Sequence, residues 1–475
     1  MKAYSPTKFV PDPTVLLFIV TAALAWVFLA PGFTEARAWV LGALLVSAAG
    51  TAIYFLSSGI GVALWALLIA AVMSRFYLDI GGLKARPEHI LMGLICVAAL
   101  FHWKRRTEPM RWITADYFLM AYVGANFFCS LVMSIAPGQT LKWAVQQTLV
   151  IMAYFLLRLF ADEPTRLRGA VRVLIAVGAL EGAYAVICFY SNILFNTTFG
   201  VEVGQYGTFP GTYGTLFEAN ILGAFSASCL LMALVIYFQE RQRRYLLATA
   251  LTFAGMMIAL SRAAIIAAAV SLVVLLFVGV RKGFVGRSGV KAVGTALLIT
   301  TLVLASAIIP LYVQRFSTVE VSDISADPDT ALRVVTIGMA VDDIVQHPIL
   351  GNGTSSFQLL VSNKELGFTD LDETGTWIGN VEMRVIHDTG IVGLVIFVYF
   401  LVYLAVPAWK LLRKQHHPEL LGLMLGALVY SMTFQATEGT LLAFSWVHLG
   451  LIGCAVAIYY PQGKGLREPL DSVSQ

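Results

Sequence analysis

Charge is what this sequence has least of. Only 13% of its 475 residues are Asp, Glu, Lys or Arg, whereas 58% are hydrophobic and the mean hydropathy is +0.79. Soluble domains carry roughly 25% charged residues, so a chain of this length could not cover itself with hydrated side chains. The composition excludes a soluble protein and predicts an integral membrane protein.

Several motifs are missing as well. The five cysteines lie in apolar runs without CxxC spacing, so neither a disulfide framework nor a zinc site is predicted. There is no P-loop and no GxGxxG motif after a strand, and the net charge of +4 is too small to indicate nucleic acid. The opening MKAYSPTKFVPDPT lacks the pattern of a removable signal peptide, so we expect the first helix to remain in the mature protein.

Long apolar runs are abundant. A helix needs about 20 apolar residues to cross the hydrocarbon core. We therefore predict an all-α integral membrane protein, a polytopic helical bundle of about 14 transmembrane helices. The predicted spans lie near residues 14–30, 37–56, 59–79, 88–103, 113–134, 141–160, 169–194, 214–238, 245–260, 262–280, 291–311, 388–408, 419–437 and 441–460.

Basic residues cluster on alternate loops between these spans, near residues 104–111, 158–172, 241–244, 281–291 and 410–414. By the positive-inside rule these loops are cytoplasmic, and both termini fall on the same side. Lys84 and Arg86 are the exception, on the opposite side. The predicted division is eleven spans within 1–311, a partly helical periplasmic loop over 312–387, three spans within 388–460 and a cytoplasmic tail over 461–475.

The long outer loop contains its own helix. Asp327 can cap it, with Pro328 at the first helical position, and the residue before Pro348 should end it. Gly351 and Gly353 allow a tight turn after that end. We expect an amphipathic helix on or over the membrane surface, because an apolar stripe recurs at helical spacing: Val334, Ile337, Val341, Ile344 and Val345.

Two DxD pairs in this loop resemble metal-binding motifs, Asp327/Asp329 and Asp370/Asp372. Helix capping and loop solvation are the favoured explanation, and no metal site and no cofactor are predicted. His347 could be a ligand or a base. The alternative is a surface histidine at a helix end, where the helix dipole favours its charge.

Arginines on the predicted outer side point to an anion. Ser261–Arg262 sits between two apolar runs, and an arginine at a membrane boundary is a functional-site hypothesis. Its alternative role is snorkelling to lipid headgroups. Arg315 and Arg333 lie on the same side, and Arg384 is a further candidate. A guanidinium binds phosphate bidentately and keeps its charge.

Carboxylates and a histidine accompany these arginines. Glu218, with Asn220 close behind, starts a span near the outer face and could be a general base, an arginine partner or a helix N-terminal charge. Glu181 lies deeper and is interpreted as a structural or gating partner. His387–Asp388 precedes a span, either as an interfacial cap or as catalytic groups.

Four segments together resemble the O-antigen ligase/polymerase superfamily, the bacterial membrane glycosyltransferases that use undecaprenyl-pyrophosphate-linked glycans. In chain order they are GTYGTLFEAN, the SRAA turn, RFST followed by ALRVVTIGMAVDDIVQHPILGNGTSSF, and DTGIVGLVIF. The arginine, helix and His–Pro–x–Leu–Gly–x–Gly run are the most specific of these. The resemblance covers roughly residues 200–400.

The resemblance implies a GT-C-like fold in the bacterial inner membrane and a metal-independent, inverting glycosyl transfer. It implies Arg262 as the pyrophosphate ligand, with Arg333 and Arg315 supporting. The histidine of the family's His–Asn pair falls here on Gly379, and only Asn380 matches. No arginine precedes the GTYG segment, where the family often has one.

The implied partners are an undecaprenyl-pyrophosphate-linked glycan donor, a glycan or lipid-linked acceptor, membrane lipids and other polysaccharide-assembly proteins. The general base would be Glu218, His387 or Asp388. A polymerase of polysaccharide repeat units (O-antigen or exopolysaccharide) is the first hypothesis, and a ligase that attaches glycan to lipid A–core or another acceptor is the second. A lipid-linked oligosaccharide flippase is the alternative from another class.

Overall fold

The structure is a computed structural model, and it describes residues 61–80, 83–103, 110–203, 210–317, 328–360, 377–415 and 417–460. The predicted spans at 14–30 and 37–56, the tail at 461–475 and three of the four DxD aspartates lie outside the described residues. Within them the fold is helical, with two short antiparallel hairpins.

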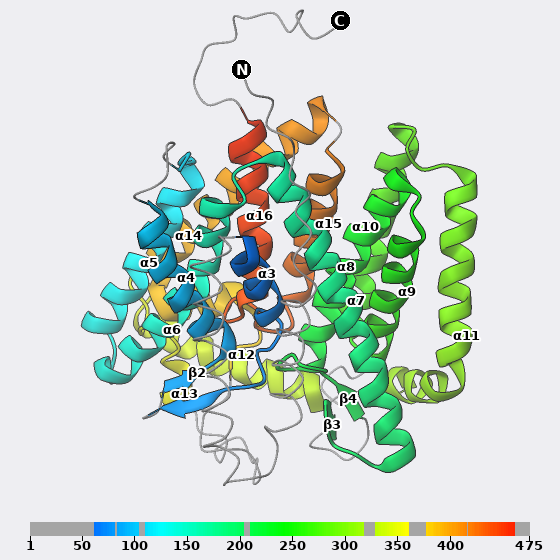
Figure 1. The fold of residues 1–475 in the computed structure, drawn as a ribbon. Coiled ribbons are helices and arrows are strands. Elements are labelled where there is room, and N and C mark those ends of the chain that lie inside the picture. The colour runs from blue at the N-terminus through cyan, green and yellow to red at the C-terminus, as the bar shows by residue number, and fades with distance from the viewer. Residues whose placement is uncertain are drawn as a thin grey trace, which may run out of the picture.

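The described helices are numbered α3 to α16 (Figure 1). The hairpins consist of β1 (Leu78–Ile80) with β2 (Leu83–Ala85), and β3 (Val201–Val203) with β4 (Pro210–Thr212). The helices are α3 (Gly61–Ala70), α4 (Pro87–Trp103), α5 (Thr114–Val132), α6 (Pro137–Phe160), α7 (Pro164–Phe195), α8 (Ala219–Glu240), α9 (Arg243–Ile258), α10 (Arg262–Arg281), α11 (Arg287–Ser317), α12 (Pro328–Gln346), α13 (Phe357–Leu360), α14 (Val381–Lys414), α15 (Pro418–Thr433) and α16 (Ala443–Tyr459).

Most predicted spans correspond to a helix in the structure. The prediction of a span at 59–79 is wrong, because α3 ends at Ala70 and the β1–β2 hairpin follows. The boundaries of the long loop also shift, since α11 continues to Ser317 and α14 already begins at Val381. The helix predicted from Pro328 is present as α12 and ends at Gln346, before Pro348.

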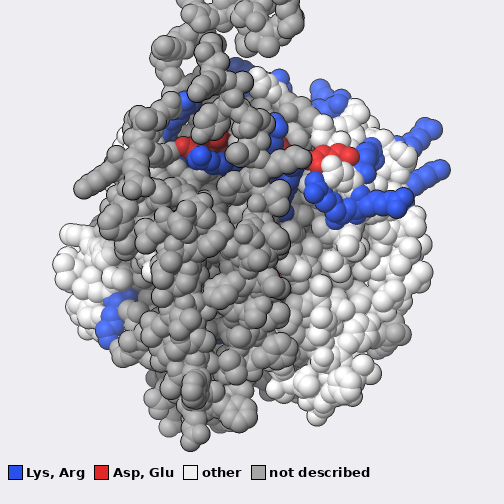
Figure 2. Space-filling view, in the orientation of Figure 1, with Lys and Arg blue, Asp and Glu red and all other residues white. Residues whose placement is uncertain are grey.

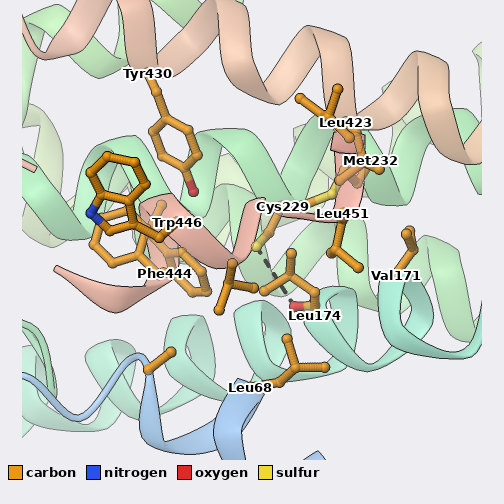
Figure 3. Close-up of a cluster of buried hydrophobic side chains, with 14 of the residues drawn as sticks. Leu68, Val171, Leu174, Cys229, Met232, Leu423, Tyr430, Phe444, Trp446 and Leu451 are labelled. Atoms are coloured by element: carbon orange, nitrogen blue, oxygen red, sulfur yellow. Dashed lines mark hydrogen bonds between the residues drawn. The ribbon is translucent and has the colours of Figure 1, made fainter. Parts of the chain in front are cut away.

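α8 is the central helix of the bundle. Every residue from Ile221 to Phe238 is buried. Its neighbours α7, α15 and α16 contribute apolar side chains to one core, in which the Sγ of Cys229 on α8 faces the carbonyl of Leu174 on α7 at 3.7 Å (Figure 3). Burial of apolar surface between these helices fixes their positions around α8.

The outer helices carry large apolar side chains on their exposed faces. On α10, Ile266, Val273 and Phe277 are at least half exposed, and Leu298 and Leu302 on α11 are similar. Seven described helices are long and apolar enough to cross a membrane, and three shorter apolar helices accompany them. An apolar surface around an apolar core is what a bilayer requires of a helical bundle.

The bundle has two chemically different ends. α12, α13 and both hairpins lie at the lower end in Figure 1, which we call the pocket end. The loops that follow α6, α8, α10 and α14 lie at the opposite end, the basic end, where Lys and Arg side chains gather on the face shown in Figure 2. Among the described residues, the predicted basic clusters near 158–172, 241–244, 281–291 and 410–414 lie at this one end. Most of the cluster predicted at 104–111 lies outside the described residues.

Candidate functional site

α12 crosses the pocket end with its polar face turned inward. Thr336 and Ala340 are buried, and Arg333 and Asp343 lie on the same face one turn away on either side. The predicted apolar stripe faces outward instead, because Val334 and Val345 are 62% and 71% exposed. This orientation directs the helix's charged groups into the protein and leaves its apolar stripe for the surroundings.

The loop after α12 packs into a break in α14. Inside an unbroken helix the carbonyls of His387 and Asp388 would accept from the backbone four residues later. Here they accept from the N–H groups of Asn352 and Gly353, at 2.8 and 3.0 Å. The N–H groups of the glycine-rich turn therefore replace the donors that these two carbonyls lose at the break.

The backbone N–H groups that follow the break also find acceptors in the turn after α12. The N–H groups of Ile391 and Val392 donate to the carbonyls of Pro348 and Ile349, at 2.9 and 3.3 Å. Gly390 makes the break possible with φ +65°, and a Cβ there would meet the Ile349 carbonyl oxygen at 2.1 Å. The His–Pro–x–Leu–Gly–x–Gly run is thus a backbone splice that ties the end of α12 to α14.

A pocket of about 190 Å³ opens between α12 and the start of α8. Its wall comes from the start of α4, the start of α8, α12, the residues before α14, and the α15–α16 loop (residues 434–442). The lining residues are Arg86, Phe217, Glu218, Ile221, Arg333, Thr336, Trp377, Gly379, Ala436, Thr437, Glu438, Leu441 and Leu442. Two guanidinium groups and two carboxylates share an otherwise largely apolar wall.

The two arginines enter from different elements. Arg333 is half-buried on α12, and its side chain makes no hydrogen bond or ion pair with any described residue. Arg86 follows the β1–β2 hairpin, donates to the Leu441 carbonyl at 3.1 Å and lies 3.8 Å from the Glu88 carboxylate. Burial lowers the pKa of Arg86 from its ordinary value, and the charge of Glu88 opposes that shift. Both cations retain capacity for an anion.

Glu218 stands at the N-cap position of α8 at the pocket wall, although its side chain makes no capping hydrogen bond. Its Oε1 accepts from Asn220 Nδ2 at 3.0 Å and from Thr437 Oγ1 at 2.8 Å. The preceding turn is held by Glu181, whose two oxygens accept from the N–H and the hydroxyl of Thr215, each at 2.7 Å. The contacts of Glu181 fit the structural alternative in its prediction.

Glu438 is the second carboxylate of the pocket, and it is only 8% exposed. Its Oε1 accepts from Arg384 Nη1 at 3.0 Å, from the Thr440 N–H at 2.7 Å and from the Thr440 hydroxyl. Its Oε2 is buried without a hydrogen-bond partner among the described residues. Hydrogen bonds to Oε1 therefore hold the carboxylate in place, whereas Oε2 accepts none from the described residues.

Arg384 does not line the pocket. Its guanidinium lies between Glu438 and Asp388, with Nε 3.3 Å from Asp388 Oδ2, and Nη2 donates to Gln147 Oε1 at 3.3 Å. Because two buried carboxylates already surround it, a pyrophosphate would have to displace them. The position of Arg384 therefore fits a structural ion pair and not the predicted role of phosphate ligand.

His387 is completely buried between two aspartates. Its Nδ1 lies 3.3 Å from Asp388 Oδ1, and its Nε2 lies 3.4 Å from Asp343 Oδ2 on α12. The Phe357 ring packs edge-on against the imidazole. Neither His387 nor Asp388 lines the pocket, so both link α12 to α14 rather than face a substrate there.

The mouth of the pocket carries aromatic rings. Phe217 and Trp377 meet edge-to-face with centroids 6.2 Å apart, and Trp377 is 37% exposed. The Arg75 guanidinium lies 5.7 Å from the centre of the Phe217 ring. Rings beside a few charged groups are typical of small-molecule sites.

Other predicted site residues lie apart from the pocket lining. Arg262 is the first residue of α10, and Ser261 caps that helix by accepting from the Ala264 N–H at 3.4 Å. Gly223 contacts Ser261, which brings this turn beside the first turn of α8. Arg315 lies in the last turns of α11, and His347 is exposed after the end of α12. Arg262 stays a predicted ligand at the same end of the bundle.

Asn380 caps α14. Its side-chain oxygen accepts from the Met383 N–H at 2.9 Å, and its Nδ2 donates to Gln435 Oε1 at 3.0 Å. This contact joins the start of α14 to the α15–α16 loop that carries Glu438. The neighbouring Gly379, where the family has histidine, lines the pocket.

Sequence reasoning missed Arg86 and Glu438 as site residues. Arg86 did leave a signal, because it breaks the positive-inside pattern that the other basic clusters follow. Glu438 left none beyond being a lone carboxylate between two apolar runs. Among the described residues, no group of three or more His, Cys, Asp or Glu side chains is arranged to hold a metal ion.

These features define the class of the protein: a multi-pass, helical membrane protein with a charged pocket at one end of its bundle. Residues 247–398 match the family model described as O-antigen ligase, which confirms the resemblance to the O-antigen ligase/polymerase superfamily. No curated protein matches the sequence. The matched segment contains Arg333 and Trp377, whereas Arg86, Glu218 and Glu438 lie outside it.

Proposed function

We propose that this protein is a membrane glycosyltransferase that uses undecaprenyl-pyrophosphate-linked glycan on the periplasmic face of the bacterial inner membrane and polymerises polysaccharide repeat units. The observation that carries the proposal is the pocket itself. It presents Arg86 and Arg333 together with Glu218 and Glu438 at the end opposite the basic loops. A lipid-linked sugar pyrophosphate has an anion and hydroxyl groups, and this mixed lining suits both.

The chemistry needs no nucleotide and follows from the pocket's charges. Arg86 and Arg333 bind the pyrophosphate and stabilise the negative charge that grows as it leaves the anomeric carbon, a type of electrostatic effect that is often the largest catalytic contribution. Phe217 and Trp377 offer apolar faces to a sugar ring. An acceptor hydroxyl attacks from the opposite side, so the anomeric centre is inverted, and no metal ion takes part.

Arg262 approaches from a neighbouring helix start and is a further phosphate ligand in this proposal. The Ser261 cap and the Gly223 contact hold its helix beside α8, at the end of the bundle where Glu218 lies. In this proposal Arg86 and Arg333 bind the sugar-linked phosphate, and Arg262 binds the lipid-linked phosphate.

A ligase is the second candidate, and the family description favours it. The two activities differ in what accumulates when the gene is deleted. Loss of a polymerase leaves single repeats on the final acceptor, whereas loss of a ligase leaves long chains on the carrier lipid.

The test is to delete the gene in cells that make the native glycan and to analyse the carrier lipid and the acceptor. Reintroduced wild-type protein must restore assembly, and Arg333→Ala and Arg86→Ala must not. Repeats trapped in the cytoplasmic leaflet would instead identify a flippase and overturn the proposal.

A further inference from the structure

One carboxylate oxygen of the pocket-lining residue Glu438 is available to accept a hydrogen bond from a ligand. Glu438 is more than nine-tenths buried, and its Oε2 has no hydrogen-bond partner among the described residues. A buried acceptor without a partner costs free energy, and buried polar atoms in proteins are nearly always satisfied. Glu438 lines the pocket, so a group that enters the pocket can supply the missing donor.

The rest of the carboxylate is held firmly. Arg384 and Thr440 donate to its Oε1, and the adjacent Thr437 hydroxyl donates to Glu218. Arg384 is itself fixed by Asp388 and Gln147. A carboxylate fixed through one oxygen is preorganised to accept a hydrogen bond through the other.

We infer that Glu438 is the catalytic residue that binds the acceptor hydroxyl and takes its proton, a step that rests on the proposed glycosyl transfer. The acceptor oxygen forms its bond to the donor's anomeric carbon while the bond from that carbon to the phosphate oxygen breaks. The electron pair of the broken bond leaves with the lipid pyrophosphate. The hydroxyl proton goes to Glu438 Oε2, and from there to water when the products leave.

Glu218, the base candidate from the sequence, also lines the pocket but is arranged differently. Its Oε1 is occupied by Asn220 and Thr437, and it stands at the N-terminus of α8. A carboxylate at a helix N-terminus interacts favourably with the helix dipole. Glu218 therefore suits hydrogen bonding to sugar hydroxyls better than proton transfer.

His387 cannot take the proton through the chain of charges that connects it to the pocket. That chain runs from Glu438 to Arg384, then to Asp388 and His387. A guanidinium is effectively always protonated, so Arg384 passes no proton onward. Arg384 and His387 are thus positioning residues, which hold Glu438 and connect it to the helix that carries Arg333.

The experiment separates binding from transfer. Detergent-permeabilised membranes from the deletion strain hold accumulated lipid-linked glycan, and purified full-length protein is added to them. Undecaprenyl pyrophosphate alone serves as the binding probe. We expect Glu438→Gln to bind this probe within about threefold of wild type and to lose transfer by roughly 10²- to 10⁴-fold, as for the loss of a general base.

Chemical rescue distinguishes a base from a structural group. Added formate should restore part of the transfer by Glu438→Ala, because it can occupy the vacated site, and should not restore Arg333→Ala. The matched control is Glu163→Gln, an exposed carboxylate at the basic end, just before α7, that does not line the pocket. It should transfer at the wild-type rate, and thermal unfolding should show that all variants are folded.

Three results would overturn the inference: Glu438→Gln transferring within tenfold of wild type, its probe binding falling in parallel with its transfer, or no response of Glu438→Ala to formate. These leave the proposed function standing. If wild-type protein itself converts none of the accumulated glycan, the proposed function fails, and the role of Glu438 fails with it.

Discussion

Two buried arginines in this bundle, Arg158 and Arg384, differ in how completely their carboxylate partners are hydrogen-bonded. Arg158 on α6 is 2% exposed and contacts both oxygens of Asp116, at 3.0 and 3.3 Å. Tyr154 and the Ile113 N–H complete the hydrogen bonding of that carboxylate. Arg384 on α14 is buried to a similar degree but contacts Glu438, which has one oxygen without a partner at the wall of a pocket.

The difference shows that a buried charge does not by itself mark a functional site. In the Arg158–Asp116 cluster at the basic end, both carboxylate oxygens accept hydrogen bonds from protein groups, and the cluster joins α5 to α6. In the Arg384–Glu438 cluster, Glu438 Oε2 has no partner among the described residues, and Glu438 lines the pocket. An unpartnered polar group points to a binding site only where its residue also lines a pocket, as Glu438 does. The predictions below compare the structural cluster with the pocket and its supports.

The largest effect should come from Arg158→Ala. It leaves the buried Asp116 without its cation, and breaking a buried pair costs about 3–5 kcal/mol. We expect a marked fall in the thermal unfolding temperature of the detergent-solubilised protein. Undecaprenyl pyrophosphate should not restore stability, because no residue of α5 or α6 lines the pocket. Unchanged unfolding would show that the cluster is not structural.

Arg333→Ala should have the opposite profile. Its side chain has no partner among the described residues, so folding should be retained, while transfer falls about 10²- to 10³-fold through loss of a charge-stabilising donor. Transfer in permeabilised membranes and the unfolding temperature measure the two effects. Arg244→Ala, an exposed residue at the basic end, is the matched control. Equal loss in both variants would contradict a specific phosphate site.

Gly390→Ala should destabilise the splice between α12 and α14. The positive φ and the contact with the Ile349 carbonyl lead us to expect a loss of roughly 1–3 kcal/mol, with reduced transfer as Arg333 shifts. Gly338→Ala is the control, because a Cβ there meets nothing within 4 Å on exposed α12. It should be neutral or stabilise by about 0.5–1 kcal/mol. If Gly390→Ala unfolds at a higher temperature than Gly338→Ala, the hydrogen bonds between the turn after α12 and the break in α14 do not stabilise the protein.

The smallest effect should come from Trp377→Ala at the pocket mouth. An aromatic contact is worth about 0.5–1.5 kcal/mol, so KM for the glycan should rise about 2- to 10-fold while kcat changes little. Trp377→Phe should restore most of the affinity. A loss confined to kcat would mean that the ring positions reacting groups instead of contacting a sugar.

The bundle was largely predictable because hydropathy and basic clusters act locally. About 20 apolar residues make a span wherever they occur, and Pro328 and Pro348 bound α12 in sequence as in structure. The failure at α3 has a non-local cause. Residues 59–79 are apolar enough for a span, but the chain after α3 leaves the helical conformation and makes distant contacts such as that of the Arg75 N–H with the Thr215 carbonyl.

The candidate site was only half predictable. Arg333 and Glu218 were identified from their own neighbourhoods, and both line the pocket. His387 and Arg384 have equally suggestive neighbours in sequence, yet Asp343 from α12 pairs with His387 and Glu438 from the α15–α16 loop pairs with Arg384. The apolar stripe on α12 was correct as a pattern, but only packing decided that it faces outward.

The sequence by itself determined that the protein is a helical membrane bundle, where its basic loops lie, and that it resembles a family of glycan-transferring enzymes. These properties depend on composition and local spacing. The tertiary structure decided which charges meet, because Arg86 and Glu438 are separated by most of the chain and share a pocket only after α4, α8, α12 and α16 have packed. It also decided which of them remain unsatisfied, since that depends on every partner the fold provides.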